Sequence, residues 1–496
     1  MNKTKIKLAI GALSLVTLAS CSKNLLNLNP PDSIALGEAF QQVSDAEKWD
    51  GGIYATLRGN TNGGYTMAPD IQADELNATL DYGNNYGGIH TWQGFTAGDY
   101  EISGEWSAYY AAISTINAAI EGYPNIKTSS PSDVAEMNEL TGDAYLARAF
   151  YYHKLVLRWA KAYDPSSAST DLGVPLMLKY DVSALPARAT VADTYTQIMS
   201  DITTARALLD GVTGQAGSIY FTQDAVLALE ARVKLCMHDW AGAKAAADSV
   251  IATGNYPLIT SQAAFNSYWL NDDPGETIMQ PNISQTNERP NANTMYINYN
   301  VGTGEDDPYY MPAQWVVDMY DNADIRKTSY YTNTSVNFLG NTYTNVWVVG
   351  KFPGNPILQS APAPQSNYQN APKIFRVAED YLISAEAAVQ AGNPGAAAAP
   401  LNALRTARGL AALGTVALQD VMDERTRELA FEGFRLDDLK RWNLGFTRHN
   451  PQNTAMLVGG ANYLGQTQAA GADKFVWGLP TNDITINHNL VQNQGW

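Results

Sequence analysis

Small residues recur at a fixed offset in two helical stretches of this chain. In the first, Ala231 is followed twelve residues later by Ala243. In the second, Ala385 is followed twelve residues later by Ala397, after a Gly-Asn-Pro turn at 392–394. Small side chains at such offsets let two antiparallel helices approach closely and stack on further pairs. A chain built in this way is predicted to be mostly α.

The rest of the chain divides into further helices and two long irregular regions. Residues 106–120 and 141–163 have helical patterns that can supply further pairs. Residues 60–104 and 255–372 are instead rich in glycine, asparagine and aromatic residues, with short strand-like pieces such as 345–349. Irregular stretches of this length inside a domain are usually functional. We therefore expect a helical scaffold with tetratricopeptide-repeat-like pairs and large loops that contain short strands.

The first residues indicate where the protein goes. Three lysines precede an apolar stretch at 8–19, which is shorter than the roughly 20 residues that span a bilayer. Leu-Ala-Ser-Cys follows, so residues 1–20 are predicted to be a lipoprotein signal peptide and Cys21 the lipid-attachment site. An ordinary signal peptide is the alternative. With Cys21 acylated, Cys236 has no partner and is predicted to be a buried apolar residue.

Charge and composition restrict the class of ligand. The formal net charge is −17, which disfavours nucleic acid, an anionic membrane surface and a polyanionic ligand. Only 16% of the residues are charged, while the chain has 28 tyrosines and 11 tryptophans. Aromatic faces pack on the C–H groups of sugars, and amides bond to their hydroxyls. The composition therefore favours an uncharged, hydroxylated ligand.

No motif for catalysis or for metal binding stands out. The sequence has neither a Gly-x-Ser-x-Gly elbow nor a phosphate-binding loop, so we predict no catalytic residues and no cofactor. A glycosidase needs only two carboxylates, and 49 acidic residues leave that alternative open. No zinc or iron site is predicted, because the five histidines are scattered, and an acidic turn is favoured over calcium at 306–307. The histidines are His90, His153, His238, His449 and His488.

The densest charge cluster, at 424–442, is interpreted as structural. Arg425 and Glu428 are spaced i,i+3, and Asp437 and Arg441 are spaced i,i+4, as in pairs on one helix face. Gly433 is predicted to end or kink a helix. We expect these charges to tie helices together.

Two aromatic loops are the candidate binding site. Tyr82, Tyr86 and Trp92 lie in one loop, where flanking glycines favour exposure of Trp92. The second loop contains four tyrosines and is followed by Trp315, for which a binding role and a core role are equally favoured, whereas Trp106 is assigned to the core. The candidate ligand-binding residues are Asp74, Asn77, Tyr82, Tyr86, Trp92, Tyr296, Tyr299, Tyr309, Tyr310 and Trp315.

The order of several motifs resembles the SusD/RagB family of nutrient-binding lipoproteins. The resemblance runs from Cys21 to Trp496. Its motifs include Leu-Leu-Asn-Leu-Asn-Pro at 25–30, Trp106-x3-Tyr110, Thr-Gly-Asp-Ala-Tyr-Leu-Ala-Arg-Ala at 141–149, the charged run at 423–433, Arg-Leu-Asp-Asp-Leu-Lys-Arg-Trp at 435–442 and Gln-Asn-Gln-Gly-Trp at 492–496.

The resemblance implies a SusD-like fold and a binding protein that is not an enzyme. Residues 21–215 are expected to form its N-terminal region and residues 216–496 its C-terminal region. The implied function is capture of a glycan for a SusC-like TonB-dependent barrel, at the outer membrane, through a lipid anchor and facing the cell exterior. A peptide or protein ligand and, less favoured, carbohydrate hydrolysis are the alternatives.

Overall fold

A computed structural model describes most of the chain. The predicted signal peptide and Cys21 lie outside the described residues. No helix within the described part is long and apolar enough to cross a membrane. The described residues are 38–290, 295–296, 298–300, 302–358, 369–449, 451–459 and 463–496.

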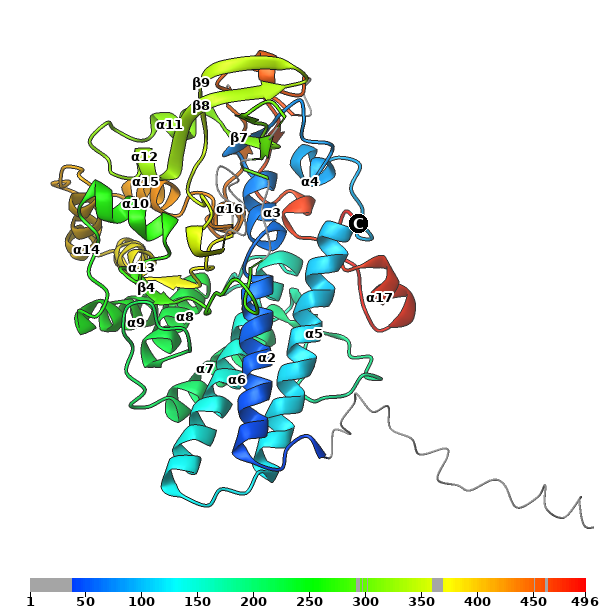
Figure 1. The fold of residues 1–496 in the computed structure, drawn as a ribbon. Coiled ribbons are helices and arrows are strands. Elements are labelled where there is room, and N and C mark those ends of the chain that lie inside the picture. Colours follow the sequence, from blue (N-terminus) through cyan, green and yellow to red (C-terminus); the bar gives the residue numbers. More distant parts are fainter. Residues whose placement is uncertain are drawn as a thin grey trace, which may run out of the picture.

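Paired helices form the scaffold, as predicted (Figure 1). Three pairs pack in sequence order, and the second helix of the middle pair packs on the first helix of the last pair. That contact joins segments more than a hundred residues apart in the chain. The pairs are α6 (Pro131–Trp159) with α7 (Val191–Leu208), α8 (Gln223–Cys236) with α9 (Trp240–Thr253), and α13 (Val377–Gln390) with α14 (Pro394–Ala407).

The alanines at the twelve-residue offset lie at the helix contacts. Ala231, Ala243, Ala385 and Ala397 are all completely buried. A larger side chain at these positions would force the helices apart, and overpacking typically costs 1–3 kcal/mol, as an order of magnitude. Cys236, in α8, is free and buried, as predicted. The spacing therefore identified the packing correctly.

Two long helices, α2 (Val43–Asn60) and α5 (Tyr100–Gly122), pack on each other and on α6 (Figure 1). Trp106 is 3% exposed and belongs to the core, as predicted. At the far end of α5, a Cβ on Gly122 would overlap the ring of Phe40. Glycine is therefore required for the close approach between that end of α5 and the start of the described chain.

The two irregular regions contain more helix than predicted. Residues 60–104 include α3 (Gly64–Gln72) and α4 (Gly87–Thr91), and residues 255–372 include α10 (Gln262–Leu270) and the short α11 (Gln314–Asp318) and α12 (Lys327–Tyr330). Burial rather than local preference stabilises α3, whose last six residues are all buried despite a proline at 69. The expectation that these regions lack helix was wrong in part.

The strand-like piece named from the sequence does form a strand. The piece at 345–349 lies in β9 (Asn341–Val349), which forms an antiparallel hairpin with β8 (Tyr331–Phe338). Leu339 and Gly340 both have positive φ, as a tight two-residue turn requires. Together with β5 (Tyr299–Asn300) and β6 (Glu305–Asp306), they form a four-stranded sheet in the order β5-β6-β8-β9.

The charged segment at 424–442 is structural, but its partners differ from those predicted. Glu428, at the end of α15 (Leu418–Glu428), accepts hydrogen bonds from Arg326, Arg376 and Arg408. Arg425 bonds to Asp438 rather than to Glu428. Arg441 pairs with Asp438 and with Glu386 in α13, whereas Asp437 pairs with Arg158 in α6. Gly433 lies beyond α15, with φ of +80°.

Burial makes the Glu428 contacts interdependent. The side chains of Glu428, Arg326 and Arg408 are fully buried, and that of Arg376 is 2% exposed. Desolvation alone would raise the pKa of Glu428, but the charges of Arg408, Arg376 and Arg326 and the bonds from Arg408 lower it well below its ordinary value. Loss of the carboxylate would leave several cations without a partner.

We expect Glu428→Gln to lower the free energy of unfolding by roughly 3–5 kcal/mol at neutral pH, because it leaves buried arginines without their carboxylate partner. The depressed pKa means that this stabilisation is present above the ordinary value of 4.5 and is lost as pH falls through the folded value. Thermal and denaturant unfolding measure both effects. Glu121→Gln, an exposed change in α5, is the control and should stay within about 0.5 kcal/mol. An unchanged stability with lost ligand binding would instead make Glu428 part of a binding site.

Candidate ligand-binding site

A strand pair brings the two predicted aromatic loops together. Strand β1 (Leu76–Ala78) pairs antiparallel with β7 (Tyr310–Pro312), and Asn77 lies opposite Met311. Tyr310 donates a hydrogen bond from its hydroxyl to the carbonyl of Asn85 at 2.6 Å. The loops therefore form one continuous region, although more than two hundred residues separate them in the sequence.

Most of the predicted ligand-binding residues are buried in this region. Asp74, Asn77, Tyr82, Tyr86, Trp92, Tyr296 and Tyr310 are each at most 9% exposed. Tyr299, Tyr309 and Trp315 are half-buried. A ligand approaching from solvent would reach few of these ten side chains directly.

Trp92 is a core residue, so the expectation of exposure was wrong. Its indole N–H donates to the carbonyl of Gln72 at 2.7 Å, and its ring packs edge-on against Phe446 and Phe475. The residue has φ of +59° at the end of α4, which turns the glycine-rich chain inward. Flexible glycines therefore permitted burial here instead of preventing it.

Asp74 and Trp315 hold the scaffold behind the loops. The carboxylate of Asp74 accepts two bonds from Arg435, both at 2.8 Å. The guanidinium of Arg435 lies over the ring of Trp315, whose indole N–H donates to the carbonyl of Asp74. Tyr296 packs against Phe431. The contacts of Asp74 and Trp315 occupy polar groups that a ligand would otherwise use.

An open depression lies directly above the buried tyrosines. Its volume is about 610 Å³, and it adjoins α4 and the beginning of α5. Tyr100, the first residue of α5, is 65% exposed there. Asn84, Thr91, Gln93, Asp99, Glu101 and Tyr463 also line it, with Gly87, Gly88 and Gly94.

Two predicted residues support this depression from below. The ring of Tyr86 packs edge-on against Tyr100, with ring centres 6.2 Å apart. The hydroxyl of Tyr82 is hydrogen-bonded to that of Tyr463, and their rings are also edge-on, at 5.7 Å. Tyr82 and Tyr86 thus form a second layer that orients the half-buried Tyr463 and the exposed Tyr100.

Polar groups surround the exposed ring. Asp99 precedes α5, and its carboxylate accepts bonds from the backbone and hydroxyl of Thr96, both at 2.9 Å. Burial raises the pKa of Glu101, which faces the same depression. An exposed aromatic ring can pack on the C–H groups of a sugar. The amide and carboxylate oxygens beside it can accept hydrogen bonds from the hydroxyls of the sugar.

Tyr100 was not among the predicted site residues, although a signal for it exists. Asp99 and Glu101 flank it at a helix start. Charged neighbours in the first turn indicate that this turn faces solvent, so an aromatic residue between them is a candidate for exposure.

Comparisons with known proteins identify the family. A model described as "SusD family" matches residues 252–496, and one described as "Starch-binding associating with outer membrane" matches residues 53–235. A SusD-like protein of Formosa agariphila is 24% identical over 436 residues, covering 78% of this chain and 79% of the relative. The starch-binding protein SusD of Bacteroides thetaiotaomicron is 36% identical over 124 residues, which is 25% of this chain and 21% of that protein.

Solved structures agree on the fold. A structure described as a putative sugar-binding protein from Bacteroides vulgatus has a TM-score of 0.77 at 22% identity, covering 92% of this chain and 99% of that one. Surface glycan-binding protein A from Bacteroides fluxus has a TM-score of 0.71 at 19% identity, covering 92% and 100%. The protein described here belongs to the SusD-like family.

We expect Trp92→Ala to destabilise the fold by roughly 3–5 kcal/mol, because it leaves a cavity between Phe446 and Phe475. Tyr100→Ala, in the same region but exposed, should leave the melting temperature nearly unchanged. Thermal unfolding of both variants tests the difference. A stable Trp92→Ala protein would contradict the core assignment.

Proposed function

We propose that this protein captures an uncharged oligosaccharide at the outer membrane and passes it to a SusC-like TonB-dependent barrel. Cys21 would carry the lipid anchor, and the protein would face the cell exterior. The depression beside Tyr100 would hold the ligand without cleaving it. The lipid, the outward orientation and the barrel are proposals that derive from the sequence motifs and the family.

One observation carries the binding proposal. Tyr100 has a mostly exposed ring whose orientation is supported by the buried Tyr86. A ring fixed in this way loses little conformational freedom when it binds, so stacking on a sugar face is not offset by a large entropic cost. An open depression also admits a chain of sugars from the side.

The charges of the site select against acidic ligands. Asp99 and Glu101 line the depression, and none of the described residues that line it is basic. The formal net charge of −17 acts in the same direction over longer distances. Neutral sugar hydroxyls can instead donate hydrogen bonds to these carboxylates.

The names of the relatives are consistent with this proposal. One matched description concerns starch binding and outer-membrane association, and one relative is a starch-binding protein. Maltooligosaccharides are therefore the first probes to use. Other neutral oligosaccharides belong in the same panel, because loops of the site determine which sugar fits.

Measuring both retention and reaction products on one panel of oligosaccharides and peptides separates glycan capture, hydrolysis and peptide binding. Retention of a glycan without new reducing ends supports capture. New reducing ends would support hydrolysis by a carboxylate pair such as Asp99 and Glu101. Retention of peptides alone would support a peptide-binding member of the family.

We expect Tyr100→Ala to weaken binding of the retained oligosaccharide by about five- to a hundred-fold. The scale comes from stacking on another flat ligand, a nucleobase, at about 1–3 kcal/mol per ring. Titration calorimetry alongside thermal melting makes the measurement.

Two variants control the Tyr100 experiment. Tyr100→Phe keeps the ring and should keep most of the affinity. Tyr180→Ala removes another exposed tyrosine, 41% exposed, that does not line the depression, and should change nothing. Equal affinity in Tyr100→Ala and the wild type would place the binding face elsewhere.

We expect Cys21→Ala to give a folded protein that is released from membranes, since the thiol that would carry the lipid is absent. Membrane fractionation after a high-salt wash tests this, and Cys236→Ala is the matched control that should remain bound. A Cys21→Ala protein that stays in the membrane fraction would contradict lipid anchoring.

A further inference from the structure

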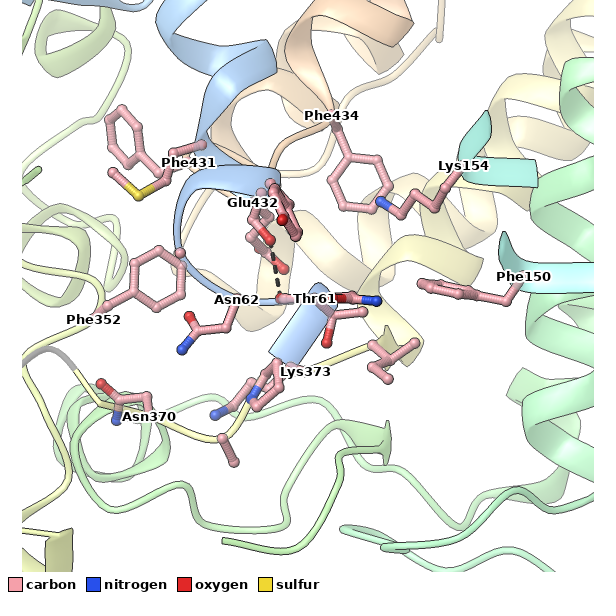
Figure 2. Close-up of a pocket in the computed structure, with 18 of the residues that line it drawn as sticks. Thr61, Asn62, Phe150, Lys154, Phe352, Asn370, Lys373, Phe431, Glu432 and Phe434 are labelled. Carbon is pink, nitrogen blue, oxygen red and sulfur yellow. Dashed lines mark hydrogen bonds between the residues drawn. The ribbon is translucent and has the colours of Figure 1, made fainter. Parts of the chain in front are cut away.

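A second pocket lies inside the scaffold, apart from the depression at Tyr100. It is small, at about 70 Å³, and none of its lining residues lines the depression. Its walls come from the connection between α2 and α3, from α6 and α8, and from the segments around 370 and 432 (Figure 2). A water molecule needs roughly 10–15 Å³ by this measure, so the pocket has room for several waters or one small ion.

The residues that line this pocket and carry a charge at neutral pH are mostly cationic, in contrast to the acidic protein as a whole. They are Lys154, Arg232, Lys373 and Glu432. Three of them already have ionic partners. Arg232 pairs with Glu379, Lys373 with Asp272, and Glu432 with Lys351.

Lys154 differs from these three. It extends from α6 toward the ring of Phe434 in Figure 2, and its ammonium lies 5.7 Å from the ring centre of Phe150. Within the described residues, it has neither a salt bridge nor a hydrogen-bond acceptor for its ammonium. The Lys154 side chain is half-buried, so its ammonium can be reached by an anion from solvent.

A second donor without an acceptor lines the same pocket. Trp269 is 2% exposed, and among the described residues its indole nitrogen has no hydrogen-bond partner. Buried donors normally have acceptors, whether protein atoms, water or bound ions. Two donors at this pocket therefore have no hydrogen-bond acceptor among the described residues.

Nearby charges do not supply the missing anion. Glu105 in α5 and Asp437 in α16 (Arg435–Arg441) act on Lys154, but both form ion pairs with Arg158. Burial, followed by the charges of Arg158 and Arg232, lowers the pKa of Lys154 to about 8. The ammonium is therefore still protonated near neutral pH, without a direct counter-ion.

We propose that this pocket binds a small carboxylate or oxyanion through the ammonium of Lys154. The volume admits an ion of a few heavy atoms and is too small for a hexose ring. The inference does not depend on the proposed glycan site. The bound ion would join α6 to the segments around 370 and 432.

Calorimetric titration of the full chain with sodium acetate and with sodium sulfate tests the proposal. Sodium chloride at matched ionic strength shows what screening alone produces. We expect saturable binding of at least one of the two ions roughly one pH unit below the pKa of about 8. Binding should weaken about tenfold roughly one unit above it, because only the protonated lysine holds the anion. Absence of saturation, or an anion affinity that does not change with pH, would overturn the proposal.

Variants at Lys154 separate ion binding from a structural role. Lys154→Met should weaken binding at least about tenfold, while Lys154→Arg should retain it. Lys161→Met removes a lysine that is 67% exposed beyond α6 and should bind as the wild type does. Without added anion, Lys154→Met should melt no lower than the wild type, because no ion pair is lost. Normal binding by Lys154→Met would refute the assignment, and if that variant fails to fold, the pH dependence of the wild type decides.

Discussion

The carboxylate of Glu428 connects three parts of the chain that lie far apart in the sequence. It bonds to Arg326 before α12, to Arg376 at the start of α13 and to Arg408 at the end of α14. Glu276 completes the group by pairing with Arg408. Because all these side chains are buried, the position of each helix end depends on the others. The irregular region at 255–372 is held against the helical pairs at this point.

Burial also explains how large loops can form a defined site. Tyr82 and Tyr86 are held inside the protein by the β1–β7 strand pair and by packing around α4. They in turn contact the half-buried Tyr463 and the exposed Tyr100. The buried layer therefore fixes the orientation of the rings that lie above it.

Local patterns predicted the helix pairs, whereas long-range contacts determined the rest. The spacing of Ala231 and Ala243 is visible in the sequence because the two helices that pack together follow each other directly in the chain. The burial of Trp92 depends on Phe446 and Phe475, which lie far away in the chain. Glu428 likewise pairs with Arg326, Arg376 and Arg408, and not with Arg425, its near neighbour in the sequence. The sequence therefore identified a region rich in glycine and aromatic residues at 60–104, but it did not show which of its side chains are buried.

The direction of α5 has a mechanical consequence. Its first residue is Tyr100, and its last, Gly122, lies against Phe40 near the start of the described chain. Twenty-three residues of helix span about 35 Å. A membrane tether attached ahead of Phe40 would act at one end of this rod, and a captured ligand would sit at the other. Tilting about such a tether would then swing the ligand through a wide arc, and the helix would act as a lever arm.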